Sequence, residues 1–184
     1  MLQFIAISAA FSYSIHGEDR NTLATLIDAS AQRLSLAKDV ALAKWDNGAP
    51  VEDLARERHV IDTATAAGRK AGLPAEFVGR FFSAQIEANK LIQYALLTDW
   101  QGQGKAPPHS AINLAQNVRP QIDRIQAVLI SALVNRTHFQ SRASCRAQVA
   151  EAIKDRKAAQ PEISESLFTT ALDRALGPLC DAAD

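Results

Sequence analysis

The chain of 184 residues carries 20 Lys and Arg against 20 Asp and Glu, so its formal net charge is zero. This length fits one domain with its own hydrophobic core. A balanced charge argues against nucleic acids and anionic membrane surfaces as partners, and the 47% of hydrophobic residues excludes wholesale disorder. Because Gly, Pro and aromatic residues are few, the composition favours an all-α protein.

The N-terminal residues 1–17 have features of a secretory signal peptide. Leu2–Phe11 forms an apolar run that is too short to span a bilayer, and small residues such as Ser14 follow it. The basic residues that usually precede such a run are missing, since the first is Arg20. We expect an exported protein, periplasmic or secreted, whose residues 18–184 form one domain. The alternative is an apolar N-terminus that packs on that domain.

Hydrophobic periodicity predicts about six helices along the chain. Asn21 or Thr22 can cap the first, which ends at the helix-breaking residues Asp46–Pro50. The third is the longest, and Pro120 lies in the first turns of the fourth or kinks it. The expected spans are 21–45, 50–72, 74–100, 111–135, 141–157 and 162–179. The sequence therefore predicts a single-domain helical bundle around one long central helix.

Two basic residues lie on the apolar face of the first predicted helix. Arg33 and Lys44 are eleven positions apart, which brings them to the same side of a helix. The neighbouring residues on this side, Ser30, Ala37 and Ala41, are small and leave room beside the two cations. The alternative is that both side chains reach solvent at the edge of the apolar face.

The third predicted helix carries a row of amides, Gln85, Asn89 and Gln93, at every fourth position. A buried amide needs hydrogen-bond partners. Such a row is therefore either a ladder of hydrogen bonds between helices or part of a polar binding site.

Asp53, Arg56 and Glu57 share one side of the second predicted helix, as a solvated charged face or as the wall of a site. With Arg33 and Lys44, Arg56 could hold a small compound with two carboxylates, because Arg pairs bidentately with a carboxylate and Lys donates as a point charge. No pairing of nucleophile and base, metal-ligand spacing or phosphate-binding glycine motif accompanies these residues. We expect neither metal nor cofactor, and a reaction that needs only binding, conformational restraint and charge stabilisation.

The residues of Leu26–Glu57 and Phe81–Trp100 follow an ordered pattern. It consists of Arg-Leu, Lys eleven positions later, Asp nine further, Arg-Glu three beyond, and then Gln-Ile-x-Ala-x-Lys-x-Ile-Gln. With this pattern the chain resembles the all-helical (type II) chorismate mutases, and over residues 20–180 it is most similar to their exported subclass. The resemblance implies the rearrangement of chorismate to prephenate without a cofactor, in a homodimer whose active sites each lie within one chain.

The resemblance also implies roles for individual residues. Arg33 and Arg56 match arginines that bind or lie near the substrate carboxylates, and Arg119 matches a further carboxylate-binding arginine that follows the long helix. Lys44 matches the lysine that contacts a carboxylate and the ether oxygen, and Gln93 matches the second donor to that oxygen.

Three further residues complete the expected site. Asp53 and Glu57 match acidic residues that hold the substrate hydroxyl, and Asn89 stands where the family has a small or polar residue. Two alternatives remain at this point: an isochorismate-pyruvate lyase on the same fold, and a helical binding module without catalysis.

The two cysteines, Cys145 and Cys180, lie in the last quarter of the chain. In a cytosolic protein they would be two thiols, and in an exported protein they would form one disulfide. The exported subclass carries a disulfide, so the resemblance implies the second state.

Overall fold

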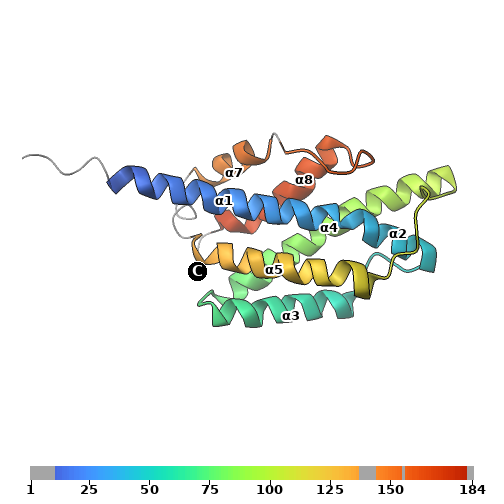
Figure 1. The fold of residues 1–184 in the computed structure, drawn as a ribbon, viewed down its shortest axis with the longest axis horizontal. Coiled ribbons are helices and arrows are strands. Elements are labelled where there is room, and N and C mark those ends of the chain that lie inside the picture. Colours follow the sequence, from blue (N-terminus) through green and yellow to red (C-terminus); the bar gives the residue numbers. More distant parts are fainter. Residues whose placement is uncertain (1–10, 137–143, 155, 182–184) are drawn as a thin grey trace, which may run out of the picture.

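The computed structural model describes residues 11–136, 144–154 and 156–181, with side chains from residue 21 onward. In these ranges the chain forms helices and short helical turns and no strand (Figure 1). The elements are α1 (Phe11–Ser35), α2 (Ala37–Asn47), α3 (Leu54–Lys70), α4 (Ala75–Gln103), η1 (Leu114–Val118), α5 (Arg119–Val134), α7 (Cys145–Ile153), α8 (Glu165–Leu176) and η2 (Gly177–Cys180). The prediction of an all-α fold is confirmed.

The start of the first helix differs from the prediction. Helix α1 begins at Phe11, so the expected cap at Asn21 or Thr22 is wrong. The carbonyl of Asn21 instead accepts a hydrogen bond from Thr25 Oγ1 at 2.9 Å, as carbonyls do inside a helix. The expected signal peptide, residues 1–17, lies outside the residues whose side chains are described. In the described part of the chain, no helix combines the length and the apolarity that crossing a bilayer requires.

The first predicted helix is divided at Leu36. Helix α1 ends at Ser35 and α2 starts at Ala37. At the break, the carbonyl of Arg33 accepts a bond from the backbone N–H of Leu36 at 3.3 Å and a second from Asn89 Nδ2 at 2.9 Å. A side chain of α4 thus binds a carbonyl in the last turn of α1, where carbonyls lack partners within the helix.

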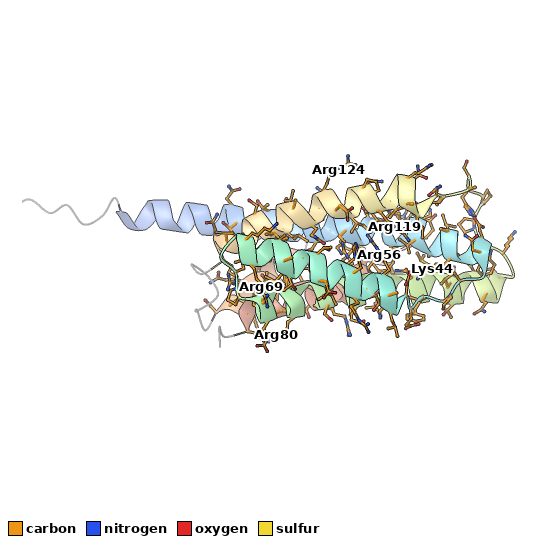
Figure 2. All side chains as sticks on the ribbon, turned by 90° about the horizontal axis from the view of Figure 1, so that it is seen from below. Lys44, Arg56, Arg69, Arg80, Arg119 and Arg124 are labelled. Carbon is orange, nitrogen blue, oxygen red and sulfur yellow. A yellow bond between two sulfur atoms is a disulfide. The ribbon has the colours of Figure 1, made fainter. Side chains whose placement is uncertain are left out.

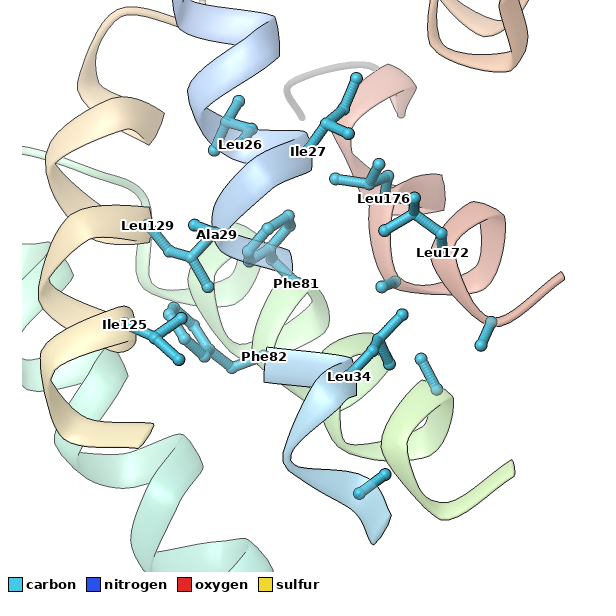
Figure 3. Packing of buried hydrophobic residues seen from close by; sticks show 14 of the residues in the cluster. Leu26, Ile27, Ala29, Leu34, Phe81, Phe82, Ile125, Leu129, Leu172 and Leu176 are labelled. Carbon is cyan, nitrogen blue, oxygen red and sulfur yellow. The ribbon is translucent and has the colours of Figure 1, made fainter. Parts of the chain in front are cut away.

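Helix α4 is the long central helix, as predicted. It packs against α2, α3 and α8, while α5 lies alongside α1 with α3 beyond it (Figure 1). The rings of Phe81 and Phe82 are fully buried, with their centroids 5.5 Å apart. Around them, α1, α5 and α8 contribute Leu26, Ala29, Ile125, Leu129, Leu172 and Leu176 (Figure 3). This core fixes the positions of the helices that carry the candidate site.

The fourth predicted helix begins with a π-helical turn. Asn113 caps this turn, η1, and its Oδ1 accepts hydrogen bonds from the N–H groups of Ala115 and Gln116 at 3.0 and 3.2 Å. Helix α5 follows at Arg119, with Pro120 in its first turn, where a missing N–H breaks no helical bond. A π-helical turn often marks a functional site, and here it precedes one of the predicted site residues.

The C-terminal helices α7 and α8 are shorter than their predicted spans. A disulfide joins Cys145, at the start of α7, to Cys180, at the end of η2. Helix α8 packs against α4 and α1, and α7 packs against α8 and α1. The disulfide predicted for an exported chain is therefore present in the structure.

Candidate active site

One cavity collects the residues that the sequence singled out. It is bounded by α1, α2, α3, α4, η1 and α5. All eight predicted site residues line it, namely Arg33, Lys44, Asp53, Arg56, Glu57, Asn89, Gln93 and Arg119. Figure 2 shows Lys44, Arg56 and Arg119 approaching one region from three elements, whereas Arg69, Arg80 and Arg124 lie away from it.

Arg33 brings a buried positive charge to this cavity. Its side chain is 4% exposed, and its Nε and Nη1 atoms have no hydrogen-bond partner among the described residues. Burial lowers the pKa of Arg33 to about 10, the charge of Arg56 adds to the effect, and Asp123 opposes it. A buried guanidinium without partners is costly. A negatively charged ligand would supply the missing hydrogen bonds.

Lys44 binds the backbone of the segment that follows α2. Its Nζ donates to the carbonyl of Pro50 at 2.8 Å and to the carbonyl of Val51. Burial lowers the pKa of Lys44, while the nearby carboxylates of Asp53 and Glu57 act in the opposite direction. An ammonium has three N–H groups, so one remains for a ligand in the cavity.

Two amides of the predicted row form a chain of hydrogen bonds at the cavity wall. Gln93 Nε2 donates to Asn89 Oδ1 at 2.7 Å, and Asn89 Nδ2 donates to the carbonyl of Arg33 at 2.9 Å. Gln93 Oε1 has no partner among the described residues. Since an amide nitrogen carries two hydrogens, Gln93 retains one N–H for a ligand.

The third amide of the row, Gln85, is buried away from the cavity. Its Nε2 donates to Ser30 Oγ at 2.8 Å and to the carbonyl of Ala175 at 3.2 Å. The row thus combines the two readings that the sequence left open. Gln85 links α4 to α1 and α8, whereas Asn89 and Gln93 face the cavity.

The acidic side chains lie at the start of α3. Asp53 caps this helix, with Oδ1 accepting from the N–H of Arg56 at 3.0 Å. The N–H of Asp53 in turn donates to Glu57 Oε1 at 3.2 Å, in a reciprocal capping arrangement. This local bonding places both carboxylates beside the cavity.

The sequence reading assigned no role to Lys90, although it stands in the matched pattern. Lys90 also lines the cavity, and its Nζ lies 3.2 Å from Glu57 Oε2 and 2.6 Å from Glu87 Oε1. The signal was a basic residue beside Asn89 on a largely buried helix. Its partner Glu57 lies 33 residues earlier, so the sequence could not show the pairing.

The cavity therefore offers several cations, two carboxylates and free amide N–H groups within a helical bundle. In the described part of the chain, no group of three or more His, Cys, Asp or Glu side chains could hold a metal ion. Such a site fits a protein that binds a small, negatively charged molecule by charge and hydrogen bonding.

Comparison with known proteins identifies the family. The family model described as chorismate mutase type II matches residues 24–94. Over 160 residues the chain is 30% identical to the secreted chorismate mutase of Mycobacterium tuberculosis. The match covers 87% of this chain and 79% of that relative. The chain is also 38% identical over 99 residues to the secreted chorismate mutase of Yersinia pestis, covering 54% of this chain and 52% of the relative. The chain belongs to the chorismate mutase family.

Solved structures agree with this assignment. The chorismate mutase of Burkholderia phymatum superposes with a TM-score of 0.81 and 39% identity, covering 89% of this chain and 99% of that one. The chorismate mutase of Burkholderia thailandensis gives a TM-score of 0.79 and 31% identity, covering 86% and 99%. The predictions of the family, an isomerase and an exported protein are confirmed. The non-catalytic binding module is not favoured.

Proposed function

We propose that this chain converts chorismate to prephenate in the cavity, with the eight predicted residues as its site. The observation that carries the proposal is the buried Arg33 guanidinium, whose Nε and Nη1 have no hydrogen-bond partner among the described residues and which lines the cavity with Lys44 and Arg56. Chorismate carries two carboxylates and rearranges within one molecule. It requires the charge complement that this cavity supplies and no nucleophile.

Binding restrains the substrate first. Arg33 and Arg119, with Arg56, hold the two carboxylates and select the compact diaxial conformer, in which the reacting carbon atoms lie close together. Arg119, which directly follows the π-helical turn η1, lines the cavity. The three guanidiniums come from α1, α3 and α5, so the position of each depends on the packing of the bundle.

Charge stabilisation accelerates the chemical step. As the C–O bond of the ether breaks, negative charge grows on its oxygen, and the free N–H groups of Lys44 and Gln93 donate to it. These hydrogen bonds are stronger in the transition state than in the ground state, so they raise the rate. Asp53 and Glu57 hold the ring hydroxyl, and Asn89 orients Gln93 through their mutual hydrogen bond.

A prephenate-formation assay with the purified protein tests this proposal. Wild type should form prephenate from chorismate, and Lys44→Ala should lower kcat/KM by about 10³-fold or more with an unchanged circular dichroism spectrum. Lys105→Ala is the matched control, because Lys105 is exposed and lies outside the cavity. Full activity of Lys44→Ala would refute the proposed site. If the protein released pyruvate from isochorismate and formed no prephenate from chorismate, its activity would be that of an isochorismate-pyruvate lyase instead of a mutase.

Two further parts of the proposal concern the mature protein. We propose that residues 18–184 form the exported domain and that it is a homodimer, on the basis of the resemblance to the exported subclass. N-terminal sequencing of the exported protein tests the first part, and light scattering during size-exclusion chromatography tests the second. Since one chain supplies all eight proposed site residues, kcat should stay constant on dilution below the dimer dissociation constant.

A further inference from the structure

Lys90 connects two helices at the cavity wall. It lies on α4, and its side chain is only 11% exposed. Its Nζ contacts Glu57 Oε2 of α3 at 3.2 Å and Glu87 Oε1 of its own helix at 2.6 Å. Ion pairs that are largely withdrawn from water are screened less by solvent than surface pairs. The pair with Glu57 therefore acts on the cavity itself.

The carboxylate of Glu57 is held at both oxygen atoms. Oε2 contacts Lys90, while Oε1 accepts the backbone N–H of Asp53 at 3.2 Å. Rotation of the carboxylate would break one of these two bonds. Each oxygen keeps a further lone pair, so the fixed carboxylate can still accept a hydrogen bond from a hydroxyl in the cavity.

Glu57 also presents an electrostatic difficulty. A carboxylate in the wall of a site for a dianion repels the ligand unless a cation compensates it. Burial favours the neutral form of Lys90, but its hydrogen bonds to Glu87 and Glu57 outweigh burial and raise the pKa of Lys90 above its ordinary value. Lys90 therefore stays charged and offsets the charge of Glu57 at the cavity wall.

We infer that Lys90 is a positioning residue that orients and neutralises Glu57, so that Glu57 can accept the ring hydroxyl of a dianionic substrate. This inference rests on the proposed function and deepens it, because it gives a role to a residue outside the eight proposed site residues. Lys90 acts on the substrate through Glu57, and its effect belongs to binding rather than to the breaking of the ether bond.

A double-mutant cycle tests the inference. Lys90→Met, which removes the charge and keeps the length, should raise KM for chorismate about tenfold and change kcat less than about threefold. Lys90→Arg should restore most of the affinity. Glu57→Gln should raise KM similarly, and Lys90→Met combined with Glu57→Gln should be no weaker than Glu57→Gln alone, because a neutral amide needs no compensating cation. If the two substitutions instead raised KM independently, so that the increase in the double variant equalled the product of the two single increases, the inference would be overturned.

Two controls separate this role from a structural one. Glu87→Gln removes the other partner of Lys90 and should leave KM within about twofold of wild type, since Glu57 keeps its cation. Lys105→Met makes the same substitution at an exposed position outside the cavity. Should Lys90→Met not fold, Lys90→Gln takes its place in the cycle.

The outcomes also distinguish this inference from the proposed function. Wild type that forms no prephenate refutes the proposed function. Active wild type with normal KM in Lys90→Met refutes only the role of Lys90.

Discussion

At the scale of single residues, Arg33 shows a conflict between stability and binding. Burial lowers the pKa of Arg33 to about 10 on folding, so between pH 10 and the ordinary arginine pKa the unfolded chain holds a proton that the folded chain releases. Stability therefore rises with pH in that window, and below pH 10 the full penalty for burying the charge is present. The protein retains this penalty at the position that we propose binds a carboxylate.

Arg33→Met should make the free protein more stable while abolishing activity. Methionine fills a similar volume without a charge, and replacement of poorly paired buried charges by apolar residues stabilises proteins by about 1 to 3 kcal/mol. Thermal unfolding at neutral pH measures the gain, and the prephenate assay measures the loss. A lower Tm for this variant would show that Arg33 has partners that stabilise it.

The dependence of activity on pH should be determined by Lys44. The Gln93 amide does not titrate, so kcat/KM should stay flat from about pH 6 to 8. Above this range activity should fall as Lys44 loses its proton, at a pH below the ordinary lysine value because burial lowers the pKa of Lys44. A pH–rate profile checks both parts. A decline between about pH 5 and 8 would contradict the role of Gln93.

At the scale of elements, α3 and α4 approach each other closely at Gly68. A Cβ atom at this position would lie 2.6 Å from Val78 Cγ2, whereas one at Gly79 would lie 3.8 Å from Thr65 Oγ1. Gly68 therefore sets the spacing between the helices that carry Glu57 and Lys90. Gly79, on the same pair of helices, has room for a methyl group.

These two glycines give a matched pair of substitutions. Gly68→Ala should destabilise the protein by about 1 to 3 kcal/mol through overpacking, and Val78→Ala should restore part of that loss. Gly79→Ala should stabilise it by about 0.5 to 1 kcal/mol, because alanine is the better helix former. Urea unfolding compares all four proteins. Equal effects at both glycines would show that helix spacing is not limiting.

The helices themselves could largely be predicted from periodicity, but two local features could not. Leu36 has neither Gly nor Pro beside it, and the break there coincides with a contact from Asn89, 56 residues from the carbonyl that it binds. The π-helical turn before Arg119 likewise has no sequence signal that we could use. Both features depend on tertiary contacts or on backbone detail that hydrophobic patterns do not encode.

At the scale of the whole molecule, the site and the disulfide occupy different parts of the bundle. The cavity is lined by residues from Arg33 to Ile122, and none comes from α7, α8 or η2. The Cys145–Cys180 bond closes a loop of 35 residues that packs α7 and α8 on the core. The disulfide should therefore support folding without taking part in catalysis.

Reduction of the disulfide should lower stability and leave kcat unchanged at room temperature. A loop of this length contributes about 3 to 4 kcal/mol on the chain-entropy model, or roughly 10 °C in Tm for a chain of this size. The double variant Cys145→Ser with Cys180→Ser tests both expectations. Thermal unfolding compares its Tm with that of wild type, and the prephenate assay compares its kcat. A loss of kcat at 25 °C without unfolding would link the disulfide to the site.

The sequence also predicted eight residues that line the cavity. The prediction used the spacing of polar residues along each helix together with the resemblance to the family. It did not reveal which of them are already bonded to each other. Asn89 looked like a residue that faces substrate, yet both ends of its amide are used within the protein. The pairing of Lys90 with Glu57 needs the approach of α3 and α4, which only the folded chain provides.

The hydrogen bond from Asn89 to the backbone of Arg33 has a consequence for the entropy of binding. The backbone of Arg33 is held by another helix. Its side chain is buried, while its Nε and Nη1 atoms have no partner in the part of the chain that the structure describes. The rotamer freedom of this long side chain is therefore lost when the protein folds. A carboxylate that arrives later meets a guanidinium already in place, so its affinity is not reduced by ordering that side chain.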